Sequence, residues 1–122
     1  MRILLGCLFL SVLSGCATLS PPRQVNDVCQ IFKQYPEWYA ATEDVAHRWL
    51  VPTSVQMAII HQESKFQADA KPPYQYFMGV IPLGRPSTAF GYAQVLDTTW
   101  DLYRQSNGHL WSSRQNFNDA VS

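Results

Sequence analysis

The feature that most constrains the fold is an apolar helical pattern in residues 53–63. Thr53 and Gln56 match the capping box, in which a threonine N-cap is followed three residues later by glutamine. Apolar side chains then spread around most of the helix circumference: Val55, Met57, Ala58, Ile59 and Ile60. A helix that is apolar on most sides is typically surrounded by protein. We therefore expect this helix at the centre of the domain.

Two helices are predicted before this central one. Asn26 can cap a short helix that carries Val28, Ile31 and Phe32. Pro36 suits the first turn of a second helix, because proline is tolerated where the backbone N–H has no intrahelical partner. The apolar residues of that helix follow three-and-four spacing: Trp38, Ala41, Val45 and Trp49.

The C-terminal half predicts further helices after a broken stretch. Residues 71–87 contain four prolines and two glycines, so we expect no helix there but a long connection, of a kind that is often functional. Asp97 can cap a helix that buries Trp100 and Tyr103 and stops at Asn107 and Gly108. The last residues, NFNDAVS, indicate the capped start of another helix. Four or five helices with no confident strand predict an all-α fold.

The N-terminus has the plan of an exported chain. Arg2 precedes an apolar run from Ile3 to Leu13, which is typical of a signal peptide and shorter than the roughly 20 residues of a membrane span. The following LSGC resembles a bacterial lipobox, which implies cleavage and lipidation at Cys16. We predict a signal peptide over residues 1–15, a lipidated cysteine and tether over 16–25, and a domain over 26–122. An ordinary signal peptide with a chance cysteine is the alternative.

Charge and cysteine content exclude several classes of protein. Nine Lys+Arg balance nine Asp+Glu, so no basic stripe is available for a nucleic acid. Of three cysteines, Cys7 leaves with the signal and Cys16 carries lipid, so Cys29 stands alone and we expect it to be buried. Cys29, His47 and His61 lack the spacing of a zinc pattern, so neither a metal nor another cofactor is expected.

Glu63, near the end of the predicted central helix, is the candidate catalytic residue. It follows Ile59 by four residues and Ile60 by three, so it lies beside both on a helix. Desolvation disfavours the charged form of a carboxyl group, and a glutamate held in such a place could act as a general acid. On spacing alone, a surface glutamate facing water at a helix end is the favoured alternative.

Two short motifs resemble the soluble lytic transglycosylase family, whose fold is related to goose-type lysozymes. They are Gln62-Glu63-Ser64 followed by Phe66, and the downstream segment AFGYAQ at residues 89–94. The resemblance implies a lysozyme-like helical domain that cleaves peptidoglycan between N-acetylmuramic acid and N-acetylglucosamine. It also implies that Glu63 is the sole acid/base and that the product is a 1,6-anhydro sugar.

The same resemblance implies a set of substrate-binding residues: Ser64, Ser87, Gly91, Tyr92 and Gln94. Aromatic side chains of the long connection could stack on sugar rings, and packing under the loop is an equal alternative for them: Tyr74, Tyr76 and Phe77. Asp69 is the nearest candidate for the second carboxylate that a hydrolase would use, but a solvated turn residue is the favoured interpretation.

Two rival functions stay open. One is a lysozyme-type hydrolase on the same fold, and the other is a catalytically silent lipoprotein that binds glycan or a partner protein. Family members carry a later tyrosine-bearing helix that this chain lacks, so we expect a C-terminal truncation. The expected setting is the cell envelope, as a monomer held by its lipid at the outer membrane, because Ala17 rather than aspartate follows the cysteine.

Overall fold

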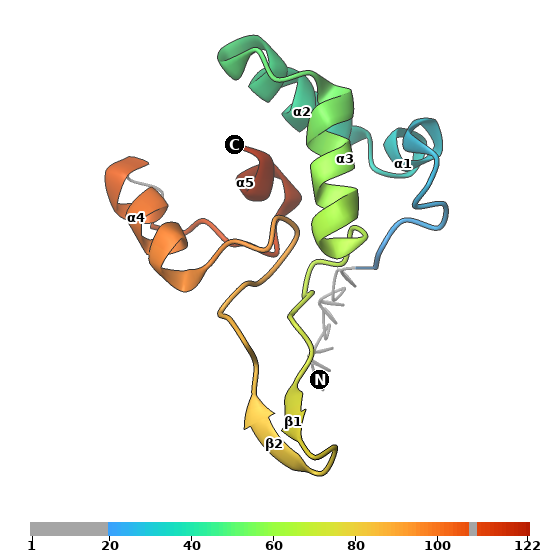
Figure 1. Ribbon diagram of the computed structural model, residues 1–122. Coiled ribbons are helices and arrows are strands. Elements are labelled where there is room, and N and C mark those ends of the chain that lie inside the picture. The colour runs from blue at the N-terminus through green and yellow to red at the C-terminus, as the bar shows by residue number, and fades with distance from the viewer. Residues whose placement is uncertain (1–19, 108–109) are drawn as a thin grey trace, which may run out of the picture.

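The computed structural model describes residues 20–107 and 110–122, which hold five helices and one two-stranded antiparallel sheet (Figure 1). The helices are α1 (Val28–Gln34), α2 (Pro36–Trp49), α3 (Thr53–Ser64), α4 (Asp97–Asn107) and α5 (Phe117–Val121). Strands β1 (Gln75–Phe77) and β2 (Ile81–Gly84) pair as a hairpin. The predicted helical class is confirmed. The hairpin corrects the expectation that residues 71–87 form an unstructured connection.

The core gathers around α2, which packs against α1, α3 and α5. At its centre the Trp38 ring lies between those of Tyr35 and Phe117, with centroid distances of 4.5 and 4.0 Å. These contacts join the start of α2 to the start of α5, which lie far apart in the sequence. The buried cluster comprises Ile31, Trp38, Met57, Ile60, Phe66, Ala68, Tyr92 and Phe117.

Local signals set most helix starts. Pro36 occupies the first turn of α2, as predicted. A capped helix start was predicted within NFNDAVS, and the cap is Asn116, whose side chain accepts a hydrogen bond from the Asp119 N–H. The cap of α1 is Asp27, whose carboxylate accepts from the Gln30 N–H, so the assignment of Asn26 was off by one residue. Helix α4 ends at Asn107, and Gly108 lies outside the described residues.

The predicted capping box at α3 is wrong. Pro52 precedes the helix, and no side chain caps its first turn. The Thr53 hydroxyl instead donates to Glu43 Oε1 at 2.7 Å. The Gln56 amide is buried and donates to the carbonyls of Thr42 and Val51 at 2.9 and 2.8 Å. Both side chains therefore join α3 to α2 rather than close its own first turn.

The segment before α1 lies against the helices. The Tyr35 hydroxyl donates to the Ser20 carbonyl, and the Arg23 N–H donates to the Gln34 side chain. Pro22 is buried. Residues 20–25, which the sequence assigns to a tether, are thus in contact with α1 and the start of α2.

Two exposed groups contradict the expected packing. Cys29 is exposed on α1 rather than buried. Trp49 at the end of α2 is 62 % exposed, although its spacing matches that of buried Trp38 and Val45. Among the described helices, none combines the length and apolarity that crossing a membrane requires.

Candidate active site

Glu63 lies in the last turn of α3, on the face that is turned away from the core. The buried face of α3 carries Gln56, Met57, Ile60 and Ser64. The opposite face borders an open hollow of ≈ 370 Å³ lined by Ser54, Val55, Ala58, Ile59, Gln62 and Glu63. One face of α3 therefore packs in the core, and the other face, although partly apolar, is exposed to solvent. The prediction that α3 is surrounded by protein is wrong for this face.

The isoleucines next to Glu63 therefore differ in their surroundings. Ile60 is 3 % exposed and belongs to the core, whereas Ile59 is 51 % exposed and shares the hollow with Glu63. Glu63 itself is exposed. The prediction that both isoleucines shield its carboxyl group from water is wrong. What the structure places beside Glu63 is an apolar surface, to which Val55 and Ile59 contribute.

The Glu63 carboxylate also differs from acidic groups that are held by partners. Asp44 pairs with Arg48, Asp97 pairs with Arg114, and Glu43 accepts from Thr53. Within residues 20–107 and 110–122, Glu63 forms neither a hydrogen bond nor an ion pair. Its carboxyl group is thus accessible to a ligand that approaches the outer face of α3.

Ser64 lies on the other side of the same helix turn. Its side chain is 5 % exposed, and its hydroxyl donates to the Ile60 carbonyl at 3.1 Å. Such a bond to the preceding turn of the same helix is common for buried serine. Ser64 was predicted to bind substrate, but its hydroxyl is not exposed to a ligand.

Residues 91–94 form a tight turn closed by an isolated bridge between Phe90 and Val95. Gly91 has φ +82°, and a Cβ atom added there would lie 2.2 Å from the Arg114 carbonyl oxygen. The Gly91 N–H donates to the Ala70 carbonyl at 3.1 Å. Glycine is thus required both for its backbone angle and for the close approach of another chain segment.

Gln94 fastens the same turn to the segment that follows α3. Its side-chain amide donates to the carbonyls of Ala70 and Gly91 at 2.8 and 2.9 Å. The contact with Ala70 lies seven residues beyond Glu63 in the sequence. Gly91 and Gln94, predicted as substrate-binding residues, are therefore placed by the structure at the joint between α3 and the turn.

Tyr92 points from the turn into the core. Its ring meets those of Trp38 and Phe117 edge to face, with centroid distances of 5.5 Å for each pair. The pKa of the Tyr92 hydroxyl is raised from 10.0 to about 12, chiefly by burial and in smaller part by nearby Tyr35, Asp69 and Glu37. Tyr92 was predicted as a substrate-binding residue, and the structure places it 3 % exposed within the aromatic cluster.

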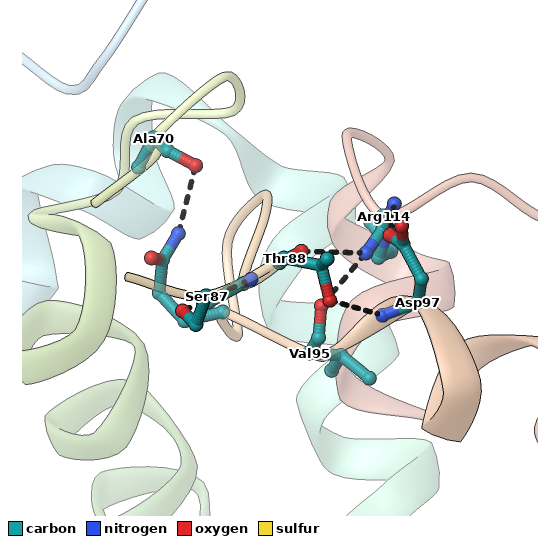
Figure 2. Close-up of polar contacts among 8 residues, drawn as sticks. Ala70, Ser87, Thr88, Val95, Asp97 and Arg114 are labelled. Carbon is teal, nitrogen blue, oxygen red and sulfur yellow. Dashed lines mark hydrogen bonds and ion pairs between the residues drawn. The ribbon is translucent and has the colours of Figure 1, made fainter. Parts of the chain in front are cut away.

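Arg114 is a residue that the sequence did not single out. Its guanidinium donates to the Val95 and Thr88 carbonyls and pairs with Asp97 at 2.8 Å (Figure 2). Its carbonyl accepts from the Tyr92 N–H at 3.2 Å. Arg114 therefore contacts the chain on both sides of the turn and the first residue of α4. A lone arginine far along the chain carries no sequence signal for this role.

Ser87 lies on the segment that enters the turn, and it is exposed (Figure 2). Its hydroxyl accepts a long hydrogen bond of 3.4 Å from the Ala89 N–H. Asp69 is exposed, while the Nε2 atom of His61 is buried without a hydrogen-bond partner in the described part of the chain. Aromatic groups of the hairpin are about half exposed: Tyr74, Tyr76 and Phe77.

The remaining predictions concern lipid and metal. Cys16 lies outside the described residues, so its lipidation stays a prediction. Residues 20–107 and 110–122 hold no group of three or more His, Cys, Asp or Glu side chains that could bind a metal ion.

Comparison with protein families matches residues 4–122 to the transglycosylase SLT domain. Searches among curated proteins and among solved structures found no match. The family match covers nearly the whole chain, including α3 with Glu63, the hairpin and the turn at residues 91–94. A mostly helical structure is compatible with the lysozyme-like helical fold of that domain. The chain belongs to the transglycosylase SLT-domain family.

Proposed function

We propose that this protein is a peptidoglycan lytic transglycosylase in which Glu63 is the single acid/base. The observation that carries the proposal is the exposed Glu63 carboxylate, which has no partner among the described residues and lies at the edge of an exposed apolar helix face. Membership of the SLT-domain family supports the substrate class. Sugar rings have apolar faces, so a glycan strand suits the surface formed by Val55 and Ile59 next to an acid.

One carboxyl group is sufficient for this reaction. Glu63 protonates the glycosidic oxygen as the bond from C1 of N-acetylmuramic acid breaks, and N-acetylglucosamine leaves with that proton. The Glu63 carboxylate then takes the proton of the muramyl C6 hydroxyl as its oxygen bonds to C1. The 1,6-anhydro product forms without water, and Glu63 returns to its starting state. A bound glycan also covers the carboxyl group, which the described protein leaves open to solvent.

The remaining site residues divide between contact and support. Ser87 is exposed, so we propose its hydroxyl as a direct substrate contact. Gly91 and Gln94 fix the turn to Ala70, and Tyr92 anchors the turn in the core. We propose that these three shape the substrate surface by position. Ser64 then supports the helix turn that carries Glu63.

The direct test is product analysis of digested peptidoglycan for the protein and its Glu63→Gln variant. General acid/base assistance is worth about 10²- to 10⁴-fold, so kcat/KM is expected to fall by at least that factor. Glu37→Gln is the matched control, because Glu37 is also an exposed glutamate but lies in the first turn of α2. Equal activity of the Glu63 and Glu37 variants would refute the role of Glu63.

The same digests separate the rival reaction. Glu63 is exposed, so water has access to it, and this observation favours hydrolysis as the second candidate. Mass spectrometry distinguishes the two reactions, because hydrolysis leaves reducing ends and transglycosylation leaves anhydro ends. Reducing ends alone would replace the proposed reaction with hydrolysis. If the protein melts cooperatively and binds glycan but forms no product, the remaining candidate is a catalytically silent glycan-binding lipoprotein.

We also propose anchoring of the protein through lipid on Cys16, at the outer membrane of the cell envelope. The support is the LSGC sequence after an apolar run. More than one acyl chain is needed for stable attachment, which a lipidated N-terminal cysteine supplies. Metabolic labelling with a radioactive fatty acid is expected to mark the protein but not Cys16→Ser. Equal labelling of both would contradict the proposal.

A further inference from the structure

A hollow with an excess of positive charge lies beside the turn at residues 91–94. It has a volume of ≈ 460 Å³, and its charged and hydroxyl-bearing lining residues are Lys71, Arg85, Ser87, Thr88, Asp97 and Arg114. Three of these side chains are cations and one is an anion. The chain as a whole has a formal net charge of +0, so this concentration of positive charge is local.

Two of the three cations have no acidic partner. Asp97 pairs with Arg114, which leaves Lys71 and Arg85 without an ion pair in the described part of the chain. The Lys71 ammonium lies 5.1 Å from the centroid of the Phe90 ring. The Arg85 guanidinium stacks over Tyr74 at 4.2 Å and donates to the Pro72 carbonyl. Ring contacts position these cations but do not neutralise them.

The hollow is held in place from several sides. The Arg114 guanidinium donates to the carbonyls of Thr88 and Val95 (Figure 2). It also lies 5.1 Å from the centroid of the Phe90 ring, which Lys71 contacts as well. The Thr88 hydroxyl accepts from the Asp97 N–H at 3.1 Å. Lining residues Thr88 and Arg114 are thus tied to the start of α4 and to Val95 at the end of the turn. Exposed Ser87 lines the same hollow as Lys71 and Arg85, and its hydroxyl can donate to an anion.

We propose that this hollow binds a carboxylate of the peptide stem that peptidoglycan carries on its muramyl residues. A planar carboxylate matches the two parallel N–H donors of a guanidinium, and lysine adds a further charged donor. The assignment of the carboxylate to a peptide stem rests on the proposed function. It adds a specificity: the protein prefers glycan that still carries peptides to glycan from which they have been removed.

The first test measures binding without catalysis. Calorimetry with the Glu63→Gln variant uses N-acetyl-L-alanyl-D-glutamate and its neutral diamide as probes. The carboxylate probe is expected to bind at least about tenfold more tightly than the diamide. Equal affinity for the two probes would overturn the proposal. Because Glu63 is replaced throughout, this result does not depend on whether Glu63 is the acid.

Charge variants locate the site. The double variant Lys71→Gln, Arg85→Gln is expected to lose at least about tenfold in affinity for the carboxylate probe, whereas Lys65→Gln, an exposed lysine outside the hollow, is expected to keep it. Arg85→Lys preserves the charge but loses the planar pair of N–H donors and the stacking on Tyr74, so its affinity is expected to lie between those of the protein and Arg85→Gln. Unchanged binding in the double variant, with a normal melting transition, would overturn the assignment.

Activity and a competing anion complete the test. On peptide-bearing glycan the double variant is expected to raise KM at least about tenfold, with kcat retained; on glycan stripped by an amidase, protein and variant are expected to match. A preference that survives in the double variant contradicts the proposal. Inorganic phosphate is the other anion to compare by calorimetry. If phosphate binds more tightly than the carboxylate probe, the assignment to peptide stems is wrong.

Discussion

The turn at residues 91–94 and the β1–β2 hairpin both lie between α3 and α4, yet they are held very differently. Backbone and side-chain hydrogen bonds join the turn to Ala70 and Arg114, and Tyr92 is buried in the core. The hairpin extends away from the helices (Figure 1), and its apolar side chains are exposed: Tyr76, Phe77, Ile81 and Leu83. The turn therefore fixes the position of the segment after α3, whereas the side chains of the hairpin are exposed and accessible to a ligand.

The largest expected effect is at Gly91, where the contrast with the hairpin can be tested by one methyl group. Gly91→Ala places a Cβ atom 2.2 Å from the Arg114 carbonyl at a φ of +82°. We expect the free energy of unfolding to fall by about 3 kcal/mol or more, because backbone atoms cannot easily move aside. Urea unfolding followed by circular dichroism measures this change.

Gly79→Ala in the hairpin is the matched control. Gly79 also has a positive φ, +76°, but no atom of the described residues lies within 4 Å of its added Cβ atom. We expect a loss of about 1–2 kcal/mol, which is the cost of the left-handed backbone alone. If both variants lose equal stability, the turn is no more tightly packed than the hairpin and the contrast between them fails.

The stability of the protein is expected to depend on pH through the buried Tyr92 hydroxyl. Its folded pKa is raised to about 12 from 10.0, so the neutral hydroxyl is favoured by folding. The associated stability is fully present below about pH 10 and is lost as the pH rises through about 12. Tyr92→Phe has no hydroxyl to ionise. Between pH 9 and 12 we therefore expect the protein to lose about 2 kcal/mol relative to this variant.

Unfolding measurements across this pH range compare the two proteins directly, since groups other than Tyr92 titrate in both. Tyr76→Phe, which removes a hydroxyl from the exposed hairpin, is expected to change the pH dependence little. Parallel stability curves for the protein and Tyr92→Phe would show that burial of this hydroxyl does not couple folding to pH.

The same contrast explains which features could be predicted from the sequence. Pro36 and Asn116 act on the backbone of their own helices, so their signals were readable. Thr53 and Gln56 had an equally good local pattern, but their side chains form hydrogen bonds to α2 instead. Thr53 donates to Glu43, and Gln56 donates to the Thr42 carbonyl. Tertiary partners decide such cases, and a single sequence does not name those partners.

The candidate site follows the same division. The position of Glu63 on α3 could be read from helix spacing, whereas the exposure of its surroundings could not, because periodicity does not say which faces find neighbours. The motif around Gly91 and Gln94 was found, but its contacts with Ala70 and Arg114 join segments far apart in the sequence. The role of Arg114 emerges only once the turn and α4 are folded together.

The smallest effect on stability is expected in the hairpin, where function rather than folding should respond. Phe77→Ser removes a side chain that is 54 % exposed, so we expect a change of within about 0.5 kcal/mol in the free energy of unfolding. If the hairpin stacks on sugar rings, KM for glycan rises several-fold, since each stacked aromatic ring contributes about 1 kcal/mol.

Trp111→Ser provides the control, because Trp111 is 98 % exposed but lies outside the hairpin. Its loss is expected to leave both stability and KM unchanged. A large loss of stability in Phe77→Ser would place the hairpin in the same class as the turn. An unchanged KM would instead mean that Phe77 is exposed without contacting glycan.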